Sequence, residues 1–113
     1  MHMQIKFETK DGITIAMISG EIDGKTSPEI QERILPELEK SSAVVLDLEE
    51  VTFMSSAGLR MLLFVYRHTQ EHACHVALAN LSEQIEDTMS ITGFLGFFEV
   101  FPSRAEALKA VGA

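Results

Sequence analysis

Two adjacent serines, Ser55 and Ser56, precede a strongly apolar segment in the sequence FMSSAGLRMLL. A buried strand is expected before them and a helix after them, so both serines lie at or next to the N-terminus of that helix. The free N–H groups of a helix N-terminus carry roughly half a positive charge, which stabilises a phosphate. Phosphorylation of a serine would add about −1.5 to −2 charges there. The spacing alone also fits a simple helix cap, worth about 1 kcal/mol.

Histidines and carboxylates give weaker signals of chemistry. His68 and His72 are four residues apart on the expected helix, but His75 lies beyond it and the sequence has no H-E-x-x-H motif. We therefore expect surface histidines and no metal site. Asp47 falls within a predicted buried strand, which favours a hydrogen-bonded structural carboxylate. The sequence has no Gly-rich phosphate loop, so it predicts no cofactor.

The composition indicates one globular domain over residues 1–113, with 46% hydrophobic residues. A net charge of −8 disfavours direct binding to nucleic acid or to anionic membranes. Cys74 has no second cysteine to pair with, and the longest apolar run, residues 61–66, is far shorter than the roughly 20 residues that span a bilayer. The N-terminal residues lack the apolar stretch of a signal peptide. These features predict a cytoplasmic protein.

The N-terminal half predicts a hairpin followed by a helix. Residues 4–9 and 13–19 alternate as strands do, and the turn Lys10-Asp11-Gly12 separates them. Thr26 and Glu29 then fit a capping box at a helix start. Pro36 removes a backbone donor from this helix, so we expect a kink or a break near residue 35.

The central part predicts a strand covered on both faces, residues 43–48, and a helix over about residues 57–71. Leu62, Phe64 and Val65 are expected in the core of the protein. Met54, Leu59 and Met61 are expected to be partly exposed at the helix start and available to a partner.

The C-terminal part predicts a strand, a helix, an edge strand and a final helix. The signals are the strand 75–79, Ser82 as a helix cap, Gly93 as a helix end, the edge strand 97–101, and the capping box Ser103 with Glu106. A hairpin followed by βα units implies an α/β fold with a mixed sheet of four to five strands, packed by about four helices.

Four segments together resemble the STAS family, the sulfate-transporter and anti-sigma factor antagonist domains. FMSSAGLRMLL resembles the family's phosphorylation segment, in which a serine at a helix start is followed by a small residue, Gly and Leu. GEIDGKTSPEI is similar to the early loop and first helix, VVLDLEEVTFM to the central strand, and TGFLGFFEVFPSRAEAL to the C-terminal signature. The four occur in the family's order along most of the chain, so the resemblance implies the STAS fold.

The resemblance places the phosphoacceptor at Ser56, followed by Ala57, Gly58 and Leu59. Ser55 stands where the best-known members carry Asp, which leaves Ser55 as the less favoured acceptor. Asp23, ahead of Gly24, is either a turn residue or a contributor to the site, because the resemblance implies that the second strand neighbours the central one. The expected partner-binding residues are Glu21, Asp23, Gly24, Met54, Ser55, Ser56, Ala57, Gly58, Leu59 and Met61.

In that family the unphosphorylated domain binds an anti-sigma factor, which is also its serine kinase and has a histidine-kinase-like ATPase fold. Phosphorylation releases the partner, and a PP2C-type phosphatase restores binding. The resemblance therefore implies a non-enzymatic binding module that leaves ATP and metal to its partners. The net charge of −8 and the absence of ligand clusters in the sequence predict a monomer or weak dimer. Two alternatives remain: a STAS subunit of a stressosome-like or lipid-transport ABC complex, and a receiver domain phosphorylated on Asp47. The receiver domain is disfavoured, because the sequence lacks the acidic pair after the first strand and the lysine after a later strand that such domains need.

Overall fold

The computed structural model describes residues 3–112, which form one mixed sheet with the strand order β1-β2-β3-β4-β5. The elements, in chain order, are β1 (Gln4–Lys10), β2 (Ile13–Ile22), α1 (Ser27–Lys40), β3 (Ala43–Met54), α2 (Ser56–Glu71), β4 (His75–Ala79), α3 (Glu83–Thr92), the 3-10 turn η1 (Phe94–Phe97), β5 (Glu99–Phe101) and α4 (Arg104–Gly112). The predicted fold class, a mixed sheet opened by a hairpin and packed by about four helices, is confirmed.

The opening hairpin follows from its turn residues. β1 and β2 pair in antiparallel register around Asp11 and Gly12, whose φ angles are +54° and +80°. Positive φ at both central residues is the geometry of a tight hairpin turn, and an Asp-Gly pair adopts it readily. β2, β3, β4 and β5 are then parallel, because a helix lies between each successive pair.

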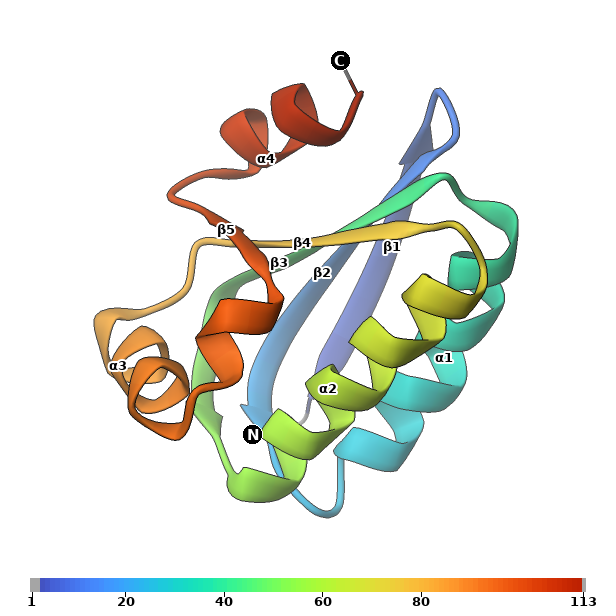
Figure 1. The fold of residues 1–113 in the computed structure, drawn as a ribbon. Coiled ribbons are helices and arrows are strands. Elements are labelled where there is room, and N and C mark those ends of the chain that lie inside the picture. The colour runs from blue at the N-terminus through green and yellow to red at the C-terminus, as the bar shows by residue number, and fades with distance from the viewer. Residues whose placement is uncertain (1–2, 113) are drawn as a thin grey trace.

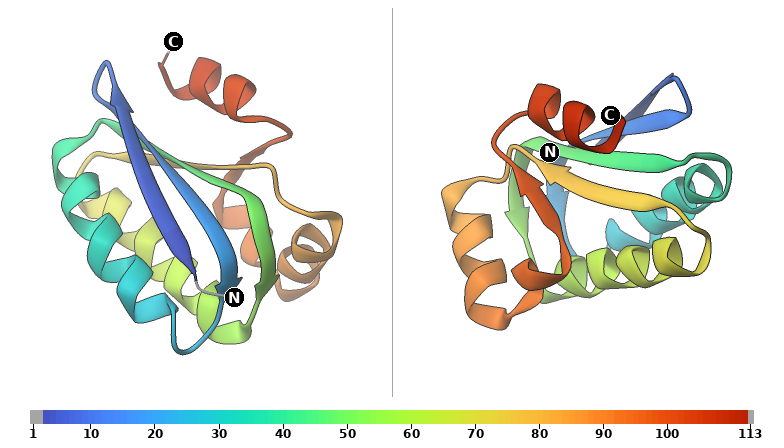
Figure 2. Two further views of the ribbon diagram at one scale, coloured as in Figure 1. Left: turned by 180° about the vertical axis from the view of Figure 1, so that it is seen from behind. Right: turned by 45° about the horizontal axis from the view of Figure 1, so that its top comes forward.

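The helices divide between the two faces of the sheet (Figure 1; Figure 2). α1 and α2 lie side by side on one face, α3 lies apart from α1 and next to η1, and α4 crosses the opposite face. Two apolar cores result, a large one that includes Ile18, Leu46 and Leu62 and a smaller one that includes Val45 and Ala107. The central strand supplies both cores, since residues 43–48 are all buried, as predicted for a strand covered on both faces.

The first helix corrects two expectations. α1 runs unbroken from Ser27 to Lys40 through Pro36, because the buried Ile30, Ile34 and Leu38 anchor it to the sheet on both sides of the proline. The proline ring is on the exposed side, where the lost hydrogen bond is least costly. Thr26 is the N-cap residue but forms no side-chain cap. Its hydroxyl instead donates to the carbonyl of Glu21 at 2.8 Å.

Several element ends also differ from expectation. β2 and β3 are longer than predicted, reaching Ile22 and Met54, because their parallel pairing continues through two irregularities in register. The last strand contains only Glu99–Phe101, since the residues before it form η1. Phe64, expected in the core, is 41% exposed.

The predicted helix signals in the C-terminal half are largely confirmed. Ser82 caps α3, Gly93 ends α3 in the left-handed region, and the Ser103 hydroxyl accepts the N–H of Glu106. Within residues 3–112, no helix has both the length and the apolar character that crossing a membrane requires.

Candidate functional site

The start of α2 assigns different roles to the two serines. Ser55 is the N-cap: its hydroxyl accepts the Gly58 N–H at 3.3 Å and its carbonyl accepts the Leu59 N–H at 3.0 Å. Its own N–H donates to the Ile22 carbonyl at 2.9 Å. The hydroxyl and backbone of Ser55 are therefore used to start the helix and to join it to β2.

Ser56, the first residue of α2, is exposed, and its hydroxyl forms no hydrogen bond with any other residue between 3 and 112. The N–H groups of Ser56 and Ala57 lie in the first turn, where a helix offers them no partner. Arg60 follows one helical turn later and is also exposed. An anion attached to Ser56 would therefore meet free N–H groups, the positive end of the helix dipole and a nearby guanidinium group.

The loop between β2 and α1 lies beside this helix start. Ile22 pairs with Met54 across the β2–β3 boundary, which confirms the expected neighbourhood. The Asp23 carboxylate accepts the N–H groups of Lys25 and Thr26 at 2.9 and 3.1 Å. Hydrogen bonds from the backbone of Thr26 and then of Lys25 hold the pKa of Asp23 below its ordinary value. Asp23 therefore shapes the loop as a turn aspartate, while Glu21 and Gly24 are exposed on it.

Gly58 is buried where α2 meets the end of β2. A Cβ atom on Gly58 would lie 2.8 Å from Met54 Cγ, 2.9 Å from Ile22 Cγ2 and 2.9 Å from the Ile22 carbonyl oxygen. The glycine therefore allows close packing of helix on strand, and a contact between Gly58 and a partner stays a prediction.

Met54, Leu59 and Met61 were also expected at the partner surface, and the structure places all three in the core. They are only 9%, 4% and 4% exposed. Met54 and Leu59 face Ile85 of α3 around a small pocket of about 100 Å³. α3 covers this side of the helix start, and that packing is not visible from the pattern of α2 alone.

A groove lies beside Ala57, between the N-terminal parts of α1 and α2, with a volume of about 340 Å³. Its lining residues are Gly24, Ser27, Pro28, Gln31, Ala57, Arg60 and Met61. Pro28, Gln31 and Arg60 were missed as site residues. Arg60 could have been found from its spacing of four from Ser56, whereas the other two required knowledge of how α1 packs on α2.

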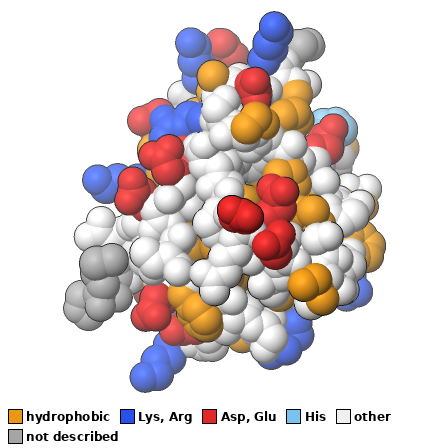
Figure 3. Space-filling view, turned by 90° about the vertical axis from the view of Figure 1, so that its left-hand side faces the viewer, with side chains coloured by type: hydrophobic (Ala, Val, Ile, Leu, Met, Phe, Trp, Pro, Cys, Tyr) orange, Lys and Arg blue, Asp and Glu red, His pale blue; other side chains and the backbone are white. Residues whose placement is uncertain are grey.

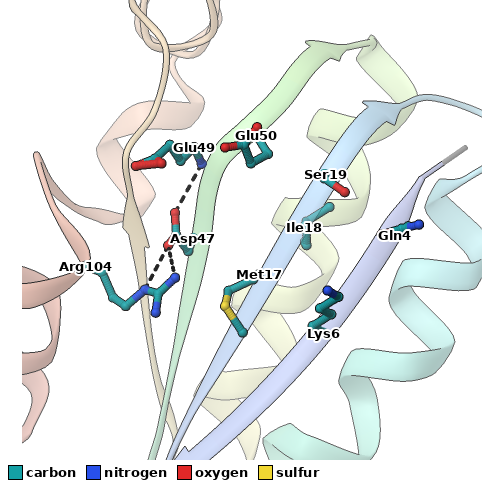
Figure 4. Close-up of a pocket in the computed structure, with 9 residues that line it drawn as sticks. All are labelled: Gln4, Lys6, Met17, Ile18, Ser19, Asp47, Glu49, Glu50 and Arg104. Carbon is teal, nitrogen blue, oxygen red and sulfur yellow. Dashed lines mark hydrogen bonds and ion pairs between the residues drawn. The ribbon is translucent and has the colours of Figure 1, made fainter. Parts of the chain in front are cut away.

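A second pocket, of about 240 Å³, lies on the α4 side of the sheet (Figure 4). Asp47, with a 7% exposed side chain, accepts hydrogen bonds from the Glu49 N–H and the Asn80 amide and pairs with Arg104 at 2.9 Å. Burial alone would raise the pKa of Asp47, but the hydrogen bonds and the Arg104 charge outweigh it and lower that pKa. Asp47 is thus a hydrogen-bonded structural carboxylate, as predicted, and ties α4 to the sheet.

The profile of the STAS domain matches residues 4–107. The chain belongs to the STAS domain family. BtrV of Bordetella bronchiseptica, named as a candidate anti-sigma factor antagonist, is 29% identical over 96% of this chain and 94% of its own length. The anti-sigma-B factor antagonist of Bacillus subtilis is 24% identical, over 88% of this chain and 92% of its own.

Solved structures share the STAS fold over nearly the whole chain. An anti-sigma factor antagonist from Mycobacterium paratuberculosis superposes with a TM-score of 0.89 at 26% identity, covering 99% of this chain and 96% of its own. The Bacillus cell fate determinant SpoIIAA in its phosphorylated form gives a TM-score of 0.75 at 19% identity, covering 96% and 99%. At that identity the second likeness concerns the fold alone.

The charges on this STAS domain are unevenly spread. Figure 3 looks onto the side that carries α3, where acidic side chains gather near the centre and Lys and Arg lie toward the rim. α3 supplies acidic residues in its first turn, Glu83 and Glu86. This face would repel a phosphate backbone and favour a basic protein surface.

Proposed function

We propose that this STAS domain is an anti-sigma factor antagonist in a partner-switching pathway. The unphosphorylated form binds an anti-sigma factor that is also a serine kinase of the histidine-kinase-like ATPase fold. Phosphorylation of Ser56 releases that partner, and a PP2C-type phosphatase resets the switch. The observation that carries the proposal is that the two serines differ at the start of α2. The Ser55 hydroxyl caps the helix, whereas Ser56 is exposed and its hydroxyl has no hydrogen bond to another described residue.

Relatives support the regulatory class. Curated proteins that match nearly the full length of this chain are named as anti-sigma factor antagonists, and a solved antagonist at 26% identity has the same fold. The proposal assigns this chain to binding rather than catalysis and places the exchange in the cytoplasm.

The proposed partner surface is narrower than the sequence predicted. It comprises the exposed loop residues Glu21 and Gly24, the first turn of α2 with Ser56 and Ala57, and the groove that Arg60 helps to line. Asp23 supports this surface by fixing the loop.

Phosphate at Ser56 should change the free protein little, because the helix N-terminus and Arg60 stabilise the added charge. A partner that fits closely over a hydroxyl would have to bury that charge instead. An unpaired buried charge commonly costs several kcal/mol, which corresponds to a hundredfold or greater loss of affinity.

The test compares three variants with wild type, using the kinase partner for phosphorylation, site mapping by mass spectrometry and titration of the complex. Ser56→Ala should bind and resist phosphorylation, and Ser56→Asp should fold but bind weakly. Ser55→Asp is the matched control, because aspartate caps a helix as well as serine does and carries no hydroxyl. This control should still be phosphorylated at Ser56.

Two results would contradict the proposal. Phosphorylation of Ser56→Ala at Ser55 with the usual loss of binding would move the switch one residue earlier. Failure of the kinase to modify wild type while still binding it would remove the switch and leave a binding domain.

A further inference from the structure

Three potential metal ligands from two helices converge at the end of α2 away from Ser56. Glu39 comes from the last turn of α1, and His68 and His72 from the last turn and C-cap of α2. One ligand atom from each lies within 4.8 Å of the other two. The Glu39 Oε2 and His68 Nε2 atoms are 3.7 Å apart, and the two imidazole rings stack with centroids 4.1 Å apart.

The hydrogen bond of His72 identifies the nitrogen that is free to bind. His72 Nδ1 lies 3.0 Å from the His68 carbonyl oxygen. A carbonyl oxygen can only accept, so Nδ1 carries the hydrogen, and the lone pair of the neutral ring is on Nε2. A backbone carbonyl that accepts the second ring N–H is the usual support of a metal-binding histidine, because it fixes both tautomer and ring orientation.

His68 contributes a polar atom that the fold leaves unsatisfied. Its side chain is only 18% exposed, and Nε2 is buried with no hydrogen-bond partner among residues 3–112. Buried polar atoms are nearly always paired, so an unpaired imidazole nitrogen beside a carboxylate calls for a ligand. This finding also corrects the expectation that His68 is a surface histidine, whereas His72 is exposed.

The backbone adds favourable charge for a cation. α1 and α2 lie side by side and run in the same direction, each leading from one parallel strand to the next (Figure 1). Their C-termini therefore lie at the same end of the sheet, where each carries about half a negative charge. Lys40, the basic residue of the last turn of α1, pairs with Glu37 at 3.3 Å, so its positive charge is balanced by a carboxylate other than Glu39.

We propose that Glu39, His68 and His72 form a binding site for a divalent transition metal ion, with Zn²⁺ the best match. Two imidazoles and one carboxylate are a donor set that suits zinc, which would keep a fourth position for water. Bonds of about 2.0–2.1 Å require ligand atoms about 3.3 Å apart. The 57% exposed Glu39 side chain and the exposed His72 can close that distance onto the less exposed His68.

Bound metal would cross-link α1 to α2 and stabilise the folded state. The site lies about 18 Å along α2 from Ser56, twelve residues at 1.5 Å each. It is therefore independent of the proposed phosphorylation switch, and its test needs no partner protein.

The experiment titrates Zn²⁺ and Co²⁺ into the full chain without a histidine tag. Calorimetry gives the stoichiometry and affinity, the visible spectrum of Co²⁺ reports tetrahedral ligation, and thermal unfolding reports stabilisation. The variants are Glu39→Gln, His68→Gln and His72→Gln, with His75→Gln as the matched control because His75 is exposed on β4 outside the cluster.

We expect one ion per chain, a tetrahedral Co²⁺ spectrum and a higher unfolding temperature with Zn²⁺. Each cluster variant should weaken binding at least about tenfold, and His75→Gln should bind like wild type. Absence of binding, a spectrum of hydrated Co²⁺ only, or equal affinity in His68→Gln and wild type would overturn the proposal. His68→Gln that unfolds at the wild-type temperature without metal but gains nothing from Zn²⁺ would support it directly.

Discussion

Replacement of Gly58 by alanine tests the packing of α2 on β2 that presents Ser56. On an exposed helix position this change stabilises a protein, because alanine exceeds glycine in helix propensity by about 1 kcal/mol. Here the added Cβ would lie below 3.0 Å from two side-chain carbons and from the Ile22 carbonyl oxygen. The side chains can move, but that carbonyl accepts the N–H of Ser55 and is held in place.

The gain in helix propensity and the cost of overpacking oppose each other, and their magnitudes decide whether Gly58→Ala stabilises or destabilises the protein. Overpacking of a close-packed core costs about 1–3 kcal/mol, occasionally more. Gly58 is in the first turn of the helix, where the gain in propensity is smaller than in the interior. We expect Gly58→Ala to lower the free energy of unfolding by about 1–2 kcal/mol, which corresponds to a fall in Tm of about 4–8 °C.

Urea unfolding followed by circular dichroism measures this effect, with Gly96→Ala as the control. Within the described part of the chain, a Cβ atom added at Gly96 would have no packing neighbour within 4 Å. Gly96 also does not adopt a positive φ, so its replacement should be neutral or slightly stabilising. A Gly58→Ala protein as stable as wild type would refute the packing argument.

Three further predictions test single side chains of the structure. Ser55→Ala should lower the free energy of unfolding by about 1 kcal/mol in urea titrations, whereas Ser56→Ala should change it little, because only Ser55 forms the cap. Because the pKa of Asp47 is lowered in the folded state, its carboxylate stabilises the fold above about pH 4, and this stability is lost as the pH falls through the folded-state pKa. Asp47→Asn removes the charge that pairs with Arg104. The free energy of unfolding should therefore fall less steeply with decreasing pH in this variant than in wild type. Burial raises the pKa of the Cys74 thiol, so a disulfide reagent at neutral pH should label Cys74 only at the rate of unfolding.

The sequence predicted the elements well where local signals agree. The Asp-Gly turn, the cap at Ser82 and the glycine end at Gly93 are each decided by a few neighbouring residues. The strand at residues 75–79 has the predicted bounds, because its apolar run stops at both ends. Pro36 misled the prediction, since a local penalty of one lost hydrogen bond is offset by burial on either side of it.

The candidate site was harder to predict because exposure depends on packing between elements distant in sequence. Met54, Leu59 and Met61 have the pattern of a helix start that faces a partner, yet α3 and α1 cover them. The contact between Glu39 and His68 depends on how α1 packs against α2, so it could not be predicted from the sequence. The spacing of residues within one helix cannot show that a neighbouring helix contributes a further metal ligand.

The start of α2 decides which serine the proposed switch would use. The helix begins at Ser56, one residue earlier than predicted, so the capping position falls on Ser55. Had the cap been Ser56, its hydroxyl would be held by a first-turn N–H, and phosphorylation would sacrifice a contact worth about 1 kcal/mol to the helix. With Ser55 as the cap, a phosphate on Ser56 leaves that hydrogen bond intact and adds charge where the helix dipole favours it. Under the proposed function, the folded domain would therefore keep the same structure with and without the phosphate, and the added charge alone would change partner binding.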